Sequence, residues 1–181
     1  MNRFHERIIN LIYKGATSSK RIRLILTPLV GAAFFCTILF AIFISFSMDR
    51  FFGFPAFISM PYRIAISMPF LLIGILLWTW SAWIFLKTKG TPVPINPPPK
   101  LVTDGPYAYS RNPMMTGVFM MLAGIGILFE SVSLTFIITP LIIIISILEF
   151  KYIEEPELEK RFGKEYTAYK KRTPIIIPKI R

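Results

Sequence analysis

Four apolar blocks determine what this chain of 181 residues can fold into. The blocks at residues 24–48 and 62–86 are long enough to cross the hydrocarbon core of a bilayer, which takes roughly 20 residues of α-helix. The blocks at residues 114–129 and 132–150 are shorter, and two polar residues separate them. We interpret this pair as a tight transmembrane hairpin, with a single long re-entrant pair as the alternative. The sequence therefore predicts an all-α polytopic membrane protein with about four transmembrane helices.

The lysines and arginines predict the orientation of the chain. Of the 21, only Arg50 and Arg63 lie outside the N-terminal segment, the loop at 87–111 and the segment after residue 150. Because basic loops stay on the inner side of a membrane, we expect both termini to be cytoplasmic, in an integral protein of a prokaryotic cell membrane. The net charge of +11 then reflects topology and attraction to membrane lipids. Nucleic-acid binding is disfavoured because no soluble basic domain is present to carry it.

The blocks divide the chain into three parts. Residues 1–23 carry apolar side chains at helical spacing, including Phe4, which predicts an amphipathic helix in the headgroup region. Residues 24–150 hold the four-span core and the cytoplasmic loop 87–113. Residues 151–181 are expected to form one amphipathic cytoplasmic helix from Pro156, followed by an extended strap.

The cytoplasmic loop should be stiff and should end at a helix start. Five prolines between residues 92 and 99 exclude a regular helix there. Asn112 and Pro113 are a preferred N-cap and a preferred first helical residue, so the third span should begin with free N–H groups facing the loop. Such a helix end favours an anionic group. Within the spans, Gly117 predicts close helix packing and Pro140 predicts a kinked or loosened fourth span.

Polar side chains gather where the third span begins and the fourth span ends: Tyr107, Tyr109, Arg111, Asn112, Glu149, Lys151, Glu154 and Glu155. A charged side chain at a membrane boundary costs free energy unless it is paired or takes part in function, so a functional site is expected here. A metal site or a nucleophile–histidine pair is not supported, since His5 is the only histidine and Cys36 the only cysteine. Aromatic rings, one arginine and carboxylates suit a soluble cofactor with a cation, a base and hydroxyl groups.

Two motifs give this cluster a family resemblance. The run Gly-Pro-Tyr-Ala-Tyr-Ser-Arg-Asn-Pro-Met at residues 105–114, followed by Gly117, resembles the superfamily of isoprenylcysteine carboxyl methyltransferases and phospholipid methyltransferases. The pair Glu154-Glu155, with the residues that follow it to the strap at 172–174, is similar to a second motif of that superfamily. The resemblance covers about half of the chain. It implies an integral membrane enzyme that uses S-adenosyl-L-methionine.

The resemblance also implies residue roles. By position, contacts to the cofactor fall on Leu101, Val102, Tyr107, Arg111, Asn112, Pro113, Met115, Glu154 and Glu155. Met115 stands where the family often has tyrosine, so one hydrogen bond to the cofactor is expected to be missing. Phe150 stands where eukaryotic carboxyl methyltransferases place a substrate-contacting arginine, and Lys151 beside it is the candidate replacement.

We expect direct in-line methyl transfer to an amphiphilic or lipid acceptor that enters from the inner leaflet, past Trp83. The acceptor is a prenylcysteine carboxylate, a lipid amine or a thiol. An amine must first lose a proton, which Glu149 could accept, and Arg111 is the second candidate catalytic residue.

Two alternatives remain open. One is an NADPH-dependent membrane sterol- or steroid-type reductase, a class with a similar C-terminal pattern. Those enzymes commonly carry an acidic residue directly after the glycine, where this chain has Val118. The other is a catalytically inactive lipid-binding membrane protein.

Overall fold

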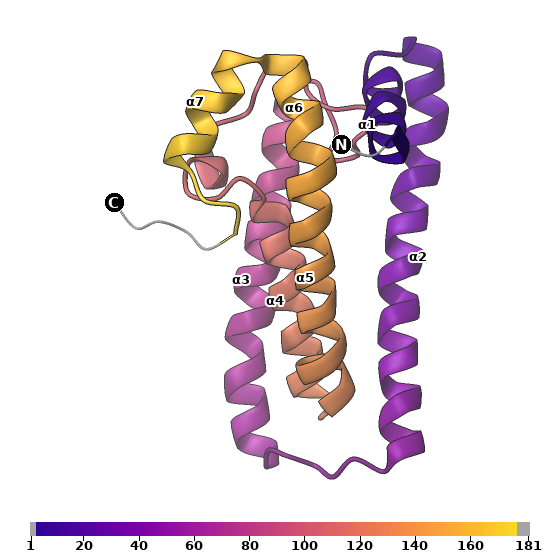
Figure 1. Ribbon diagram of the computed structural model, residues 1–181. Helices are drawn as coiled ribbons and strands as arrows, with labels where there is room; N and C mark the ends of the chain where they lie inside the picture. Colours follow the sequence, from indigo (N-terminus) through magenta and orange to yellow (C-terminus); the bar gives the residue numbers. More distant parts are fainter. Residues whose placement is uncertain (1–2, 177–181) are drawn as a thin grey trace. The chain divides into compact units, whose positions relative to one another are not determined.

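The computed structural model describes residues 3–176, and their side chains from residue 6 onward, so Phe4 of the predicted apolar stripe lies outside the described side chains. Over this range the chain is helical and contains no strand (Figure 1). This confirms the predicted all-α class. The helices are α1 (Arg3–Ala16), α2 (Lys20–Phe52), α3 (Met60–Lys87), η1 (Gly105–Ala108), α4 (Pro113–Leu128), η2 (Ser133–Ile138), α5 (Thr139–Glu149), η3 (Phe150–Glu154), α6 (Glu155–Phe162) and α7 (Lys164–Arg172).

The protein is a polytopic membrane protein. Three helices are long and apolar enough to cross a bilayer: α2, α3 and the continuous helix Ser133–Phe162, which runs from η2 to α6. Helix α4 has 16 residues and is shorter than the other three. At 1.5 Å per residue it extends about 24 Å, less than the roughly 30 Å of a hydrocarbon core. Large apolar side chains on α2 and α3 point outward, for example Leu39 and Leu76, each 65% exposed, as expected where lipid is the solvent.

The chain forms two compact units. The first unit comprises Met1–Ala33, Trp80–Pro113 and Ser146–Arg181, and the second comprises Phe34–Thr79 and Met114–Ile145. The second unit has an apolar core of Val118, Leu122 and Leu134. The first unit holds most of the polar residues singled out in the sequence.

Close packing in the second unit depends on glycines. A Cβ atom on Gly117 of α4 would lie 2.7 Å from the carbonyl oxygen of Gly74 on α3, closer than real Cβ contacts. A side chain at either position would therefore push the two helices apart. This confirms the predicted role of Gly117.

Each π-helical segment lies shortly before a proline. η2 precedes Pro140, and η3 precedes Pro156. Proline has no N–H group to donate, and its ring collides with the carbonyl four residues back. A wider turn relieves this strain, as where the Glu155 N–H donates to the carbonyl five residues back, that of Phe150. The loosening predicted at Pro140 is confirmed, while the second π-helical segment was not predicted.

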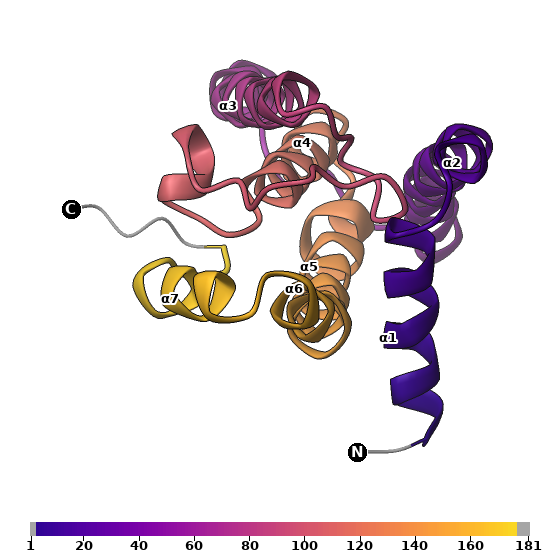
Figure 2. The same ribbon diagram turned by 90° about the horizontal axis from the view of Figure 1, so that it is seen from above.

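In the first unit, α1 packs against η3 and α6. Ile9 and Ala16 of α1 are buried, and the Lys160 ammonium of α6 donates to Asn10 Oδ1 at 2.7 Å. The prediction of one continuous C-terminal helix is wrong. Gly163 has φ of +56°, a conformation that side chains disfavour, and it divides the segment into α6 and α7 (Figure 2).

Candidate cofactor site

The loop between α3 and α4 places Tyr107 inside the first unit. Val102 and Tyr107 are buried, and the Tyr107 ring centroid lies 5.0 Å from that of Phe85 at the end of α3. Gly105 has φ of +59°, and a Cβ atom there would lie 2.5 Å from Ile84 Cδ1. Glycine is therefore required for the loop to turn into η1 this close to α3.

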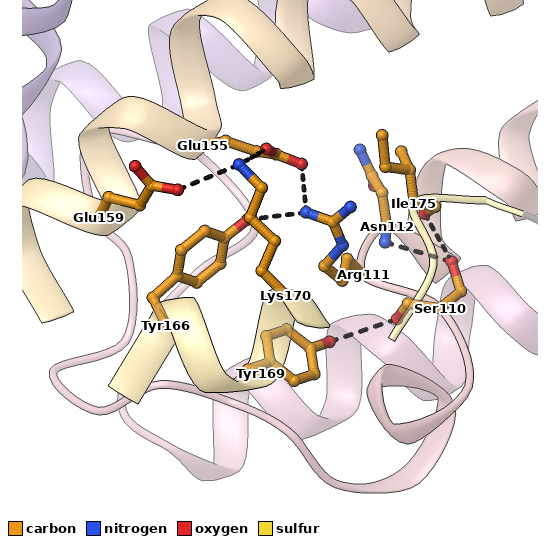
Figure 3. Close-up of polar contacts among 9 residues, drawn as sticks. All are labelled: Ser110, Arg111, Asn112, Glu155, Glu159, Tyr166, Tyr169, Lys170 and Ile175. Atoms are coloured by element: carbon orange, nitrogen blue, oxygen red, sulfur yellow. Dashed lines mark hydrogen bonds and ion pairs between the residues drawn. The ribbon is translucent and has the colours of Figure 1, made fainter. Parts of the chain in front are cut away.

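Arg111 lies in a buried polar network (Figure 3). Its Nη1 forms an ion pair with Glu155 Oε1 and donates a 3.5 Å hydrogen bond to the Tyr166 hydroxyl. The guanidinium carbon lies 5.8 Å from the centroid of the Phe150 ring. The Nε atom is buried and has no hydrogen-bond partner among the described residues. Arg111 is thus held in place through Nη1 while a second donor remains unsatisfied.

Glu155 joins the loop to α7. Its side chain is 2% exposed, and its second carboxylate oxygen, Oε2, lies 2.5 Å from Lys170 Nζ. The same ammonium lies 3.0 Å from Glu159 Oε1. These two carboxylates raise the pKa of Lys170, with the hydrogen bond that its ammonium donates to Glu155 as the main cause. Glu155 is therefore fully engaged within the protein.

Helix α7 and the strap after it fix the other side of the loop. The Tyr169 hydroxyl donates to the Tyr107 carbonyl at 2.6 Å. The Ser110 hydroxyl donates to the Ile175 carbonyl at 2.8 Å, and the Arg111 N–H donates to the Pro174 carbonyl, also at 2.8 Å. These bonds, each to a backbone carbonyl, join two segments about sixty residues apart in sequence.

The buried tyrosines of the site act as neutral groups. Burial raises the pKa of the Tyr107, Tyr166 and Tyr169 phenols well above the ordinary value for tyrosine. Loss of the phenolic proton would place a negative charge in a poorly solvated site. We conclude that these residues serve as packing and hydrogen-bonding groups rather than as bases.

Glu154 differs from its neighbour Glu155. It is half-buried, and no hydrogen bond or ion pair joins its carboxylate to another described side chain. Glu149 and Lys151 are exposed, and the Lys151 ammonium lies over the Tyr152 ring at 5.6 Å. The two adjacent glutamates therefore have different environments: one is paired inside the protein, and the other is available.

The other predicted residues lie in different places. Leu101 and Asn112 are half-buried, and Pro113 is fully buried. Trp83 is 57% exposed, with the Lys87 ammonium 5.5 Å from its ring centroid. Met115 belongs to the second unit, where it packs against the apolar core. Direct contacts therefore join Arg111, Phe150 and Glu155, whereas Met115 serves the packing of the other unit.

The sequence did not single out Ser110 or Lys170 as site residues. Lys170 begins the basic run Lys170-Lys171-Arg172, and nothing in the sequence separates it from its neighbours. Ser110 lies inside the loop motif, but its bond to the strap joins residues 65 positions apart. Pairing over such distances leaves no local signal.

The residues present fit S-adenosyl-L-methionine. That cofactor combines a carboxylate with an ammonium, a sulfonium and ribose hydroxyls. The unsatisfied Arg111 Nε–H suits an anionic oxygen, and the available Glu154 carboxylate suits an ammonium or hydroxyls. Within residues 3–176, no group of three or more metal-ligating side chains is found.

The comparisons with known proteins agree with the motifs. The family model described as phospholipid methyltransferase matches residues 62–165, more than half of the chain. No curated protein and no solved structure gave a significant match.

Proposed function

Because the chain belongs to the phospholipid methyltransferase family, within the isoprenylcysteine carboxyl methyltransferase-like superfamily, we propose that it methylates an amphiphilic acceptor with S-adenosyl-L-methionine. The general class, a membrane methyltransferase, rests on the family match. One observation carries the specific proposal. The buried Arg111–Glu155 pair, with Lys170 on its outer side, lies at the two family motifs and leaves Glu154 and the buried Arg111 Nε without a hydrogen-bond partner among the described residues.

The two glutamates have separate roles in this proposal. Glu155 holds the Arg111 guanidinium and fastens α7 to the helix. Glu154 binds the cofactor through its ammonium or ribose hydroxyls, and Arg111 Nε–H binds its carboxylate. Val102 and Tyr107, both buried, form an apolar wall that keeps water out. Leu101, Asn112 and Pro113 complete the binding loop.

The acceptor that we favour is the amine of a phospholipid. Phe150 is buried against Arg111, so no arginine occupies the position that would contact a prenylcysteine carboxylate. When bound, the cofactor supplies an electrophilic methyl group on a positively charged sulfur. The exposed Glu149 carboxylate would take a proton from the acceptor ammonium and free the nitrogen lone pair; the new N–C bond would form as the methyl–sulfur bond breaks, with a neutral thioether as the leaving group. The remaining residues contribute alignment rather than acid–base chemistry.

We place the site on the cytoplasmic face of a prokaryotic cell membrane, in accord with the distribution of basic residues. The acceptor then reaches it laterally from the inner leaflet. The exposed Trp83 ring, whose type is common at membrane interfaces, lies on the same unit as the site. Lys151 is exposed as well and is suited to contact a lipid phosphate.

The test is methyl transfer with radiolabelled cofactor in membranes that contain the overexpressed protein. Label should enter the lipid fraction with the wild-type protein. Glu154→Gln should lower the apparent cofactor affinity by roughly 10- to 100-fold, the loss expected for a charge-assisted hydrogen bond. Glu165→Gln, which removes one exposed carboxylate from α7, is the matched control. Label confined to protein or small molecules would reject the lipid acceptor, and equal affinity in both variants would reject the role of Glu154.

A further inference from the structure

The corner between α1 and α2 concentrates positive charge. Lys14 lies near the end of α1, and Lys20, Arg21 and Arg23 open α2. None of the four forms an ion pair among the described residues. Glu6 is the only acidic residue before Asp49, so this part of the chain has almost no counter-charge of its own.

Some basic residues elsewhere in the chain are paired within the protein. Arg63 pairs with Glu130 at 2.6 Å, and Arg111 pairs with Glu155. Arg23 instead has a neutral partner, since its Nη1 donates to Asn96 Oδ1 at 3.4 Å. Its Nε is buried without a hydrogen-bond partner. Unpaired charge at a membrane boundary is costly unless an anion from outside the protein compensates it.

The corner lies at the end of a candidate membrane span. Lys20 and Arg21 are exposed, and α2 continues directly as a candidate membrane span. Leu24 and Ile25, one turn further along, are 60% and 65% exposed. Lys20 and Arg21 thus precede the outward apolar side chains by one helical turn. A phospholipid has the same order, with its phosphate outside its acyl chains.

The corner is also supported by the proline-rich loop. Ile95 side-chain atoms lie within ordinary contact distance of a Cβ atom placed on Gly15, and Val93 is in similar contact with Gly31. The Thr91 N–H donates to the Asn96 carbonyl at 2.8 Å, which closes this segment into a turn. The loop thus holds Asn96 against Arg23 and leaves Lys20 and Arg21 on the outer surface.

We infer that the α1–α2 corner is a binding site for an anionic phospholipid. Lys20, Arg21 and Lys14 bind the headgroup phosphate. The half-buried Arg23 adds a further positive charge. The acyl chains lie along Leu24 and Ile25 at the start of α2. This site is separate from the methyl-transfer chemistry, so its test needs no enzymatic activity.

The experiment is native mass spectrometry of the purified protein released from nanodiscs of mixed phosphatidylglycerol and phosphatidylcholine. The wild-type protein should retain phosphatidylglycerol in preference to phosphatidylcholine. The double variant Lys20→Gln/Arg21→Gln should lose this preference by about thirty-fold, as expected for two basic residues at an anionic surface. The matched control is Lys164→Gln/Lys171→Gln, which removes two exposed cations from α7 and should change retention by less than about two-fold.

Equal loss in the two double variants would overturn the site, because it would show a general effect of net charge. Equal retention of both lipids by the wild-type protein would also overturn it. If the first variant does not fold, the wild-type protein decides the question. Retention of phosphatidylglycerol should then fall with added sodium chloride, and inorganic phosphate at the same ionic strength should release no more lipid than sodium chloride does. Insensitivity to salt, or a larger release by phosphate than by sodium chloride at equal ionic strength, would reject a lipid site.

Discussion

Glu155 is the residue whose replacement tests the structure most sharply. Glu155→Gln keeps the shape of the side chain but removes the carboxylate that Arg111 and Lys170 share. The Arg111 side chain is 8% exposed, so its cation would remain buried without a counter-charge. Breaking a buried pair in this way costs about 3–5 kcal/mol. Lys170 is 38% exposed and screened by water, so Lys170→Gln should cost at most about 1 kcal/mol.

Thermal unfolding in mild detergent, followed by circular dichroism, measures this difference. At 2–4 °C per kcal/mol for a chain of this length, Glu155→Gln should lower the Tm by about 10 °C and Lys170→Gln by about 3 °C. The double variant Arg111→Met/Glu155→Met removes both charges and should be more stable than Glu155→Gln, since no buried charge is left unpaired. Equal Tm values for Glu155→Gln and the wild-type protein, or a double variant less stable than Glu155→Gln, would refute the buried pair.

Three further predictions follow from single contacts. Tyr169→Phe removes the hydrogen bond to the Tyr107 carbonyl and should lower the free energy of unfolding by about 1 kcal/mol; an unchanged Tm would contradict this. Gly117→Leu forces a side chain against the Gly74 carbonyl and should abolish the monodisperse peak in size-exclusion chromatography. Because burial raises the pKa of the site tyrosines, their neutral form favours folding below about pH 10, and this stability is lost as pH rises through their folded-state pKa values. Tyr166→Phe should therefore leave tyrosinate absorbance near pH 10 unchanged, and a smaller amplitude would show that this phenol ionises normally.

The elements that could be predicted from the sequence depend on local rules. The apolar blocks and the run of prolines determine where helices are possible, and α4 begins at Pro113 as the Asn112-Pro113 pair predicts. The loop between α3 and α4 contains no α-helix between Lys87 and Pro113, in agreement with the five prolines at residues 92–99. These signals act over a few residues and need no knowledge of tertiary contacts.

The pairing inside the site could not be predicted, because it depends on the phase of a helix. The π-helical turn η3 adds about one residue to a turn, which rotates the following helix by about 100° relative to a regular one. After this turn Glu155 pairs with Arg111, whereas no ion pair joins Glu154 to a described residue. The signal available in the sequence is Pro156, which favours a wider turn just before it.

The C-terminal segment shows a second limit. Its apolar residues continue at helical spacing across Gly163, and periodicity alone favours one helix. Glycine tolerates both a helix and a positive φ, so the break depends on tertiary contacts. Here α7 is fixed by Lys170 on Glu155 and by Tyr169 on the Tyr107 carbonyl, contacts that the sequence does not reveal.

Binding of S-adenosyl-L-methionine tests the proposed function most directly. The purified wild-type protein in mild detergent should bind S-adenosyl-L-methionine in a calorimetric titration and should not bind NADPH. Glu154→Gln should bind it more weakly at an unchanged Tm, while Glu165→Gln should behave as the wild-type protein. Binding of NADPH in place of S-adenosyl-L-methionine, or of neither by a folded protein, would contradict the methyltransferase assignment of this site.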